Sequence, residues 1–191
     1  RILQEVRKLI YVTGDTHGDI ERFKSREMKK LGSGDTLIIC GDFGFLWDDS
    51  RAERNALKKL ASKDYTIAFV DGWSRKYNVC FIDGTHENFD LLDKYRMTVW
   101  NGGKVHRIAP NIIHLMRGQI FTIENKTIFT FGGGHSQDYN FRRDSDCWWE
   151  REQPTHAEII EGITNLRTVD YTVDYVITHE PPASLKDCLN V

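Results

Sequence analysis

The chain has 191 residues, of which 40% are hydrophobic and 28% are charged, with a formal net charge of −2. These values are typical of a soluble globular protein that buries a sizeable core, and they exclude an overall basic field that attracts nucleic acid. No run approaches 18 apolar residues, so we expect neither a membrane-spanning helix nor a membrane partner.

The four cysteines are scattered and form no Cys-x-x-Cys pair. Cys40 and Cys80 lie in apolar runs, as small core residues do. The first residues lack an apolar signal core followed by a small-residue cleavage site. We therefore expect a reducing, cytoplasmic location.

The first third of the chain repeats one pattern, in which a short apolar strand is followed by Gly-Asp and then by a helix. Leu9–Thr13 is the first predicted strand, and Asp19 is the expected cap of a helix that continues to Leu31. Thr36–Cys40 is the second strand, followed by Asp42 and a helix around Arg51–Ser62. This order predicts a parallel sheet whose functional loops lie at its carboxyl edge.

Residues 66–72 and 78–84 are two apolar runs with the same Asp-Gly ending. A local duplication and a hairpin-like insertion both explain the pair. After Trp100, short apolar runs separated by Arg117-Gly118 and by residues 124–126 predict an antiparallel meander.

Residues 137–153 are polar and aromatic, which indicates a long loop with either a functional or a packing role. Thr155 and Glu158 have the spacing of a capping box, which predicts a helix from there to about Arg167. A last buried strand then ends at His179.

The predicted strand ends carry an unusual set of polar residues. Carboxyl ends of neighbouring parallel strands converge on one crevice, and carboxylate oxygens with imidazole nitrogens suit Mn, Fe or Zn. Taken singly, His86 also fits a helix-start turn, and His179 also fits a strand-end histidine bonded to backbone. The ordered set favours a metal site: Asp15, His17, Asp42, His86, Glu87 and His179.

The stretches "GDTHGD", "CGDFG", "DGTHEN" and "ITHEPP" resemble the successive blocks of the calcineurin-like metallophosphoesterases, from about Ile10 to Pro182. The resemblance implies an α/β fold, in which a two-sheet β-sandwich is flanked by helices. It also implies two divalent metal ions (Mn, Fe or Zn) held by loops at the sheet edges.

The resemblance assigns a role to each residue of the set. Asp15 and His17 would bind the first metal, Asp42 would bridge both, and Thr85 and His179 would bind the second. His86 would protonate the leaving oxygen, and Glu87 would orient that imidazole.

Two departures from the family pattern stand out. Thr85 replaces the family's asparagine, and its shorter hydroxyl is the weaker neutral ligand. The sequence also ends before a Gly-His-x-His block, which carries one further imidazole for each metal. We therefore expect residues 1–191 to form one domain that lacks its C-terminal part.

The expected activity is metal-dependent hydrolysis of a phosphomonoester or phosphodiester by hydroxide activated between two metals, with a phosphorylated substrate as partner. One alternative is a debranching-type phosphodiesterase acting on nucleic acid, because the stretch from residue 101 to 134 also resembles RNA lariat debranching enzymes, although these usually carry Cys in place of Asp15. Another is a non-catalytic module that retains the fold.

Three residues outside the blocks are candidates for substrate binding: His135, Arg142 and Arg143. The arginine forks match phosphate oxygens, while a tight turn at His135 and local ion pairs in a solvated loop fit equally well. Trp148 and Trp149 fit either stacking on a base or loop packing, and adjacent tryptophans more often pack.

Overall fold

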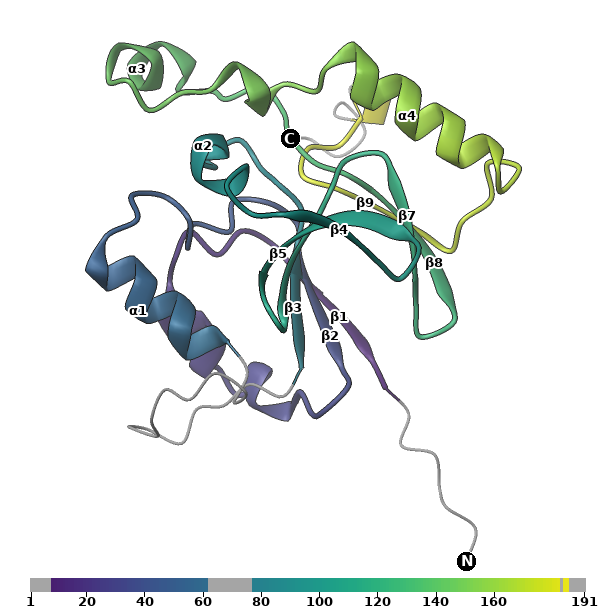
Figure 1. The fold of residues 1–191 in the computed structure, drawn as a ribbon, viewed down its shortest axis with the longest axis horizontal. Coiled ribbons are helices and arrows are strands. Elements are labelled where there is room, and N and C mark those ends of the chain that lie inside the picture. Colours follow the sequence, from purple (N-terminus) through teal and green to yellow (C-terminus); the bar gives the residue numbers. More distant parts are fainter. Residues whose placement is uncertain (1–7, 62–76, 183, 186–191) are drawn as a thin grey trace, which may run out of the picture.

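The computed structural model describes residues 8–61, 77–182 and 184–185, and Figure 1 shows their arrangement. The strands are β1 (Ile10–Thr13), β2 (Thr36–Ile39), β3 (Asn78–Phe81), β4 (Met97–Trp100), β5 (Gly103–Ala109), β6 (Ile112–Leu115), β7 (Gln119–Ile123), β8 (Lys126–Phe131) and β9 (Tyr175–Thr178). The helices are α1 (Arg51–Leu60), α2 (Phe89–Leu92), α3 (Tyr139–Asp144) and α4 (His156–Arg167), with 3₁₀ turns η1 (Ile20–Lys24), η2 (Met28–Lys30) and η3 (Glu150–Glu152).

The strands form two sheets. The larger has the order β1-β2-β3-β6-β5-β4, in which β1, β2, β3 and β6 are parallel and β5 and β4 are antiparallel. The smaller has the order β7-β8-β9, and β9 pairs parallel with β8. The carboxyl ends of β1, β2 and β3 therefore lie side by side, as the repeated strand–Gly-Asp pattern predicted.

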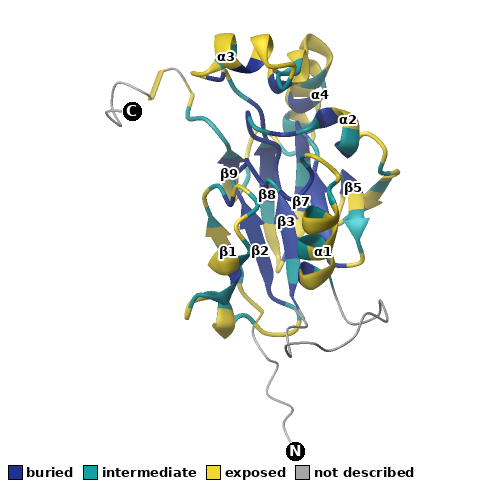
Figure 2. Ribbon diagram, turned by 90° about the vertical axis from the view of Figure 1, so that its left-hand side faces the viewer, coloured by how far each residue is buried: buried dark blue, intermediate teal, exposed yellow. Residues whose placement is uncertain are grey.

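Side chains of the central strands alternate between two cores. Leu37 and Ile39 of β2 join a cluster with Phe23, Phe81 and Leu60, on the α1 side of the larger sheet. Their neighbour Ile38 points the other way, into a cluster shared with the smaller sheet that includes Cys80, Phe121 and Ile128. Because successive strand residues face opposite sides, continuous apolar runs such as β2 indicate burial on both faces, and Figure 2 shows the buried residues concentrated in the strands.

The layers confirm the predicted fold class, a two-sheet sandwich flanked by helices. Figure 1 shows α1 on one side of the strands and α4 beyond the smaller sheet. Helix α4 docks on β7 through Asn165, whose amide donates to the Gly118 carbonyl at 2.7 Å, and through Glu161, which accepts from Gln119 at 2.9 Å. The capping box of Thr155 and Glu158 is present.

Two local predictions were wrong. The meander is divided, because β5 and β6 belong to the larger sheet and β7 and β8 to the smaller, so Arg117-Gly118 is a crossover between sheets rather than a hairpin turn. The helix expected over residues 19–31 is two 3₁₀ turns, since Ser25 is extended (ψ 158°) and its hydroxyl accepts from Met28 N at 3.2 Å. Serine competes with the backbone for hydrogen bonds in this way.

Asp19 caps η1 as expected, through a hydrogen bond from Glu21 N. Residues 66–72, the first of the paired Asp-Gly runs, lie outside the described residues. Among the residues that the structure describes, no helix combines the length and the apolar character needed to cross a membrane.

Candidate metal centre and adjoining groove

Three of the predicted ligands converge at the carboxyl edge of the larger sheet. Asp15 and His17 lie in the loop after β1, and Asp42 lies in the loop after β2. Each offers one ligand atom, and these atoms all lie within 4.8 Å of one another. The spacing follows from the parallel register of β1 and β2, which ends both strands at one level.

The separations within the cluster fit a shared metal ion. His17 Nε2 lies 3.7 Å from a carboxylate oxygen of Asp15 and 3.7 Å from one of Asp42. These gaps are too long for hydrogen bonds. Two ligands that each lie about 2.1 Å from one ion are at most about 4.2 Å apart, so an ion fits between these groups.

His179, at the end of β9, reaches the same place from the smaller sheet. Its ring nitrogens lie 3.7 Å from oxygens of Asp15 and Asp42. Its Nδ1 is also 2.8 Å from the Cys40 carbonyl, and an N–H at that position leaves the Nε2 lone pair facing Asp42. A backbone carbonyl that fixes the tautomer is the usual support for a metal-binding histidine.

The backbone is strained at two of the candidate ligands. His17 and Asp42 have φ of 45° and 47°, a region that residues other than glycine rarely adopt. The space around Asp42 is equally constrained, since a Cβ at Gly84 would collide with Asp42 Oδ1, and one at Gly41 with the His179 ring. Such strain persists where surrounding structure enforces it, commonly at functional sites.

Asp42 occupies the middle of the cluster. Its side chain is 4% exposed; Oδ1 accepts from the His86 backbone N–H at 2.8 Å, and Oδ2 lies 2.9 Å from His86 Nδ1. Burial alone would raise the pKa of Asp42, but the hydrogen bonds from His86 outweigh it and the pKa is lowered. The Asp42 carboxylate therefore stays ionised, and each of its oxygens has a His86 nitrogen as neighbour.

His86 lies between two carboxylates. Its Nδ1 faces Asp42, and its Nε2 lies 3.2 Å from Asp138 Oδ2, in the loop after β8. The hydrogen bond with Asp42 raises the pKa of His86, burial opposes the rise, and Asp138 adds to it. Thr85 Oγ1 lies 3.1 Å from His86 Nδ1, so Thr85 also borders this cluster.

A groove of about 510 Å³ opens beside these residues. His17 and His86 line one end, and Phe45, Trp47 and the start of α1 line the rest. Its size is in the range of small-molecule sites. The cluster therefore adjoins a space large enough for a small molecule.

The sequence model of the calcineurin-like phosphoesterases matches residues 8–188. The chain belongs to this family. Searches of curated proteins and of solved structures returned no significant match. Family membership confirms the resemblance on which the sequence blocks were assigned, and the family is typically dependent on divalent metals, for which Asp15, His17 and Asp42 form a candidate site.

Glu87 does not have the position that the family pattern implied. It is buried, and its carboxylate accepts from the Phe43 backbone N–H at 2.8 Å. The part of the chain that the structure describes shows no hydrogen bond between Glu87 and His86. Burial raises the pKa of Glu87 well above its usual range, opposed by that backbone hydrogen bond, and the charges of Asp42 and Asp83 raise it further. Asp138 contacts His86 where Glu87 was expected.

Arg142 also departs from its predicted role in substrate binding. Its side chain is 3% exposed, and its guanidinium donates to the Thr85 carbonyl at 2.8 Å, to the Cys147 carbonyl at 2.9 Å and to Glu152. These bonds fix the loop after β8 against the strand end that carries Thr85. Arg142 therefore holds the loop that adjoins the site, and both of its terminal guanidinium nitrogens are bonded to protein oxygens instead of being available for phosphate.

Arg143 and His135 remain on the surface. Arg143 bonds Asp144 at 2.9 Å and lies over the Tyr139 ring. The His135 backbone N–H donates to Glu180 at 2.9 Å, and its Nδ1 lies 3.2 Å from Gln153 Nε2. Within the described chain, neither contacts the metal-site residues.

The two adjacent tryptophans pack within the protein. Trp149 donates to Asp90 at 2.9 Å and meets Trp47 edge to face, while Trp148 packs on Tyr139. Sequence reasoning missed the partnership of Asp138 with His86. The one signal for it is the run Gly132-Gly133-Gly134, which ends β8 as glycines end the other functional strands.

Proposed function

We propose that the chain is a metal-dependent phosphoesterase whose centre lies at the ends of β1, β2, β3 and β9. The observation that carries this proposal is the 3.7 Å separation of imidazole nitrogens from carboxylate oxygens among His17, Asp15 and Asp42. Imidazole and carboxylate groups that lie within one ion's reach and are not hydrogen-bonded to each other suit a cation that takes N and O ligands.

Asp15, His17 and Asp42 would hold one ion, and Asp42 with His179 and the Thr85 hydroxyl would hold a second. When bound, two such ions lower the pKa of a water between them and neutralise the charge of a phosphoryl group. The Asp42 carboxylate is the shared ligand, because each of its oxygens faces a different histidine.

His86 supplies the proton for the leaving oxygen in this proposal. Its raised pKa favours the protonated imidazole, and Nε2 carries that proton toward Asp138 at the groove end. Asp138 is 45% exposed at its side chain, so it can turn from His86 when a substrate oxygen takes its place. General acid catalysis of this kind contributes roughly 10²–10⁴-fold.

The groove favours a small ester over a polynucleotide. Its charged lining comprises His17, His86, Asp48 and Glu53, and no lysine or arginine of the described chain lines it. A nucleic-acid strand needs cations along its path to pair with successive phosphates. The debranching-type alternative lacks that support here.

The test is hydrolysis of three substrates by the purified protein with Mn²⁺: an aryl phosphomonoester, an aryl phosphodiester and a branched RNA. We expect turnover of at least one aryl ester, loss of it in EDTA, and little cleavage of the RNA. Preferred cleavage of the branched RNA would establish the debranching alternative. Inactivity on all three with metal bound would favour the non-catalytic module.

A further inference from the structure

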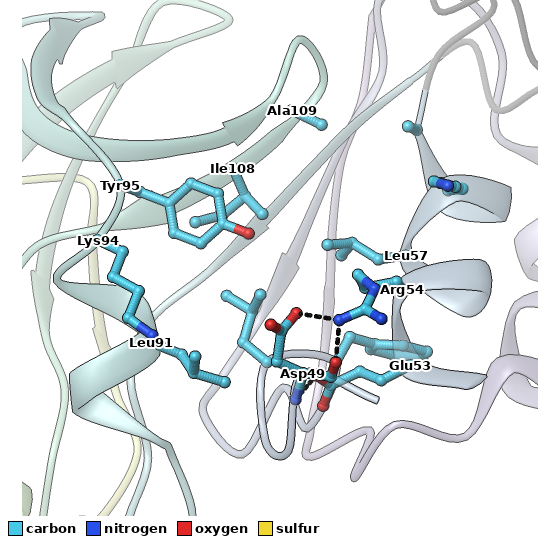
Figure 3. A pocket seen from close by; sticks show the side chains of 13 residues that line it. Asp49, Glu53, Arg54, Leu57, Leu91, Lys94, Tyr95, Ile108 and Ala109 are labelled. Carbon is cyan, nitrogen blue, oxygen red and sulfur yellow. Dashed lines mark hydrogen bonds and ion pairs between the residues drawn. The ribbon is translucent and has the colours of Figure 1, made fainter. Parts of the chain in front are cut away.

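A second cavity, of about 340 Å³ (Figure 3), adjoins the catalytic groove, with which it has Phe45 and Glu53 in common. It is bounded by α1, by the end of α2 and by the end of β5. Most of its wall is apolar and includes Leu46, Leu57, Leu91, Ile108 and Ala109. The volume is within the range of small-molecule sites.

The cavity has unpaired positive charge at its edge. The Arg54 charge is paired with Asp49 at 3.0 Å, and the Glu53 carboxylate is held by backbone N–H groups of Asp48 and Asp49. Lys58 and Lys94 also line the cavity. Within the described residues, the side-chain amino group of neither lysine makes an ion pair or a hydrogen bond. In Figure 3 the Lys94 side chain extends along the cavity edge.

Tyr95 adds a polar group to the apolar wall. Its ring lies over the cavity in Figure 3, with the hydroxyl directed inward. Burial, followed by the charges of Asp49 and Glu53, raises the pKa of Tyr95, so the hydroxyl stays a hydrogen-bond donor at neutral pH. An apolar wall with a small number of polar groups is the usual make-up of a small-molecule site.

The cavity and the catalytic groove share a wall. Phe45 and Glu53 line both. The Glu53 carboxylate accepts from the backbone N–H groups of Trp47, Asp48 (3.3 Å) and Asp49 (2.8 Å), which hold the loop that forms the groove. A ligand that moves α1 or Phe45 therefore changes the shape of the groove.

We propose that this cavity binds a small amphipathic anion, with an aromatic or branched aliphatic body against the leucines and its anionic group at one of the two lysines of the edge, Lys58 or Lys94, and that its binding alters catalysis in the neighbouring groove. The effect on catalysis rests on the proposed function, whereas the binding does not.

Binding is measured with 8-anilinonaphthalene-1-sulfonate, an apolar anion whose fluorescence rises on leaving water. We expect one molecule per chain, displaced by octanoate and not by octylamine. Lys58→Gln/Lys94→Gln should weaken binding about tenfold, through loss of the charge-assisted contact. The matched control is Lys59→Gln/Lys30→Gln, which removes two exposed lysines outside the cavity and should leave the affinity unchanged.

Leu57→Trp fills the cavity and should abolish the one-to-one binding, with circular dichroism confirming the fold. Equal affinity in the two lysine double variants, or unaltered binding in Leu57→Trp, would overturn the site. Octanoate should also change the KM for an aryl phosphate in the wild type and not in Lys58→Gln/Lys94→Gln. Binding without any effect on KM would overturn the coupling and leave the site standing, and absence of turnover altogether would count against the proposed function.

Discussion

The candidate metal centre and the group around Asp83 both combine aspartate with histidine, and their bonding is opposite. At the candidate metal centre, His17 lies 3.7 Å from both carboxylates and its side chain is 58% exposed. Behind it, Asp83 accepts from Arg117 Nε at 2.7 Å and lies 3.1 Å from His114 Nε2, with both partners buried. In the first, the open cluster, His17 is hydrogen-bonded to neither carboxylate; in the second, the saturated cluster, Asp83 is within hydrogen-bond distance of both partners.

The buried cluster is complete by itself. Arg117 also donates to the Arg151 carbonyl at 2.7 Å and pairs with Glu158 at 3.2 Å, which connects β3, the sheet crossover and α4. Burial opposes ionisation of Asp83, but the Arg117 charge and the His114 hydrogen bond outweigh it and lower its pKa to about 2. Residue type therefore does not separate a structural cluster from a candidate metal site, whereas the spacing of the imidazole from the carboxylates does: 3.7 Å in the open cluster and 3.1 Å in the saturated one.

The largest effect should come from Asp42→Asn, which breaks the open cluster. An amide lacks the charge that would serve two cations, so we expect turnover to fall by roughly 10³-fold or more, comparable to loss of a key electrostatic group. Steady-state assays with saturating Mn²⁺ measure this, and Asp144→Asn, an exposed aspartate paired with Arg143, is the control. Near-wild-type turnover would remove Asp42 from the centre.

His86→Ala separates proton donation from metal binding at the same cluster. Turnover of an alkyl phosphate, which needs a protonated leaving group, should fall roughly 10²–10⁴-fold. An activated aryl phosphate needs less protonation and should lose clearly less. The comparison of the two substrates is the measurement, and equal losses would show that His86 only positions other groups.

Arg117→Met breaks the saturated cluster and should affect stability instead of chemistry. Leaving Asp83 buried without its cation should cost about 3–5 kcal/mol of unfolding free energy. Urea denaturation at neutral pH measures this, with Arg107→Met on the surface of β5 as the control, expected to cost under about 1 kcal/mol. A loss of turnover per folded molecule, without a loss of stability, would contradict the distinction between the clusters.

The pH dependence of the same variant gives a second measurement. Because the folded pKa of Asp83 is depressed, its contribution to stability is present above its unfolded value, about 4. That contribution is lost as the pH falls toward the folded value of about 2. The wild type should therefore lose stability over this window, and Arg117→Met should lose less.

Glu87→Gln should have the smallest effect on turnover. It tests whether Glu87 has a structural role, like Asp83, or acts on His86 in the candidate centre. A buried side chain bonded to the Phe43 N–H, without contact to His86, should change kcat within about threefold. Because its folded pKa is raised, its contribution to stability is present below the unfolded pKa and lost as the pH rises. Metal-free wild type should show this decline, and the variant should not. A large fall in kcat would restore Glu87 as the residue that orients His86.

Much of the arrangement follows from local sequence. The runs that end at Thr13, Ile39 and Phe81 are short, apolar and followed by Gly-Asp or Asp-Gly. Parallel strands of this kind bring their loops to one edge, so the cluster of Asp15, His17 and Asp42 could be predicted without coordinates.

Three of the failures depended on contacts between distant segments, whereas the helix over residues 19–31 failed through the local hydrogen bond of Ser25. Arg142 looks like a phosphate ligand in sequence, but Glu152 and the Thr85 carbonyl take up its donors. In the sequence, Arg117-Gly118 resembles a hairpin turn, but in the structure the Arg117 side chain is buried and donates a hydrogen bond to Asp83. Asp138 meets His86 only because the loop after β8 folds back over β3.

The most direct test of the account is the location of metal in a crystal grown with Mn²⁺, measured by anomalous diffraction at the manganese edge. The account predicts an anomalous peak bounded by Asp15, His17, Asp42 and His179, and no peak beside Asp83, whose oxygens are already bonded. Manganese bound elsewhere on the chain, with this cluster empty, would contradict it.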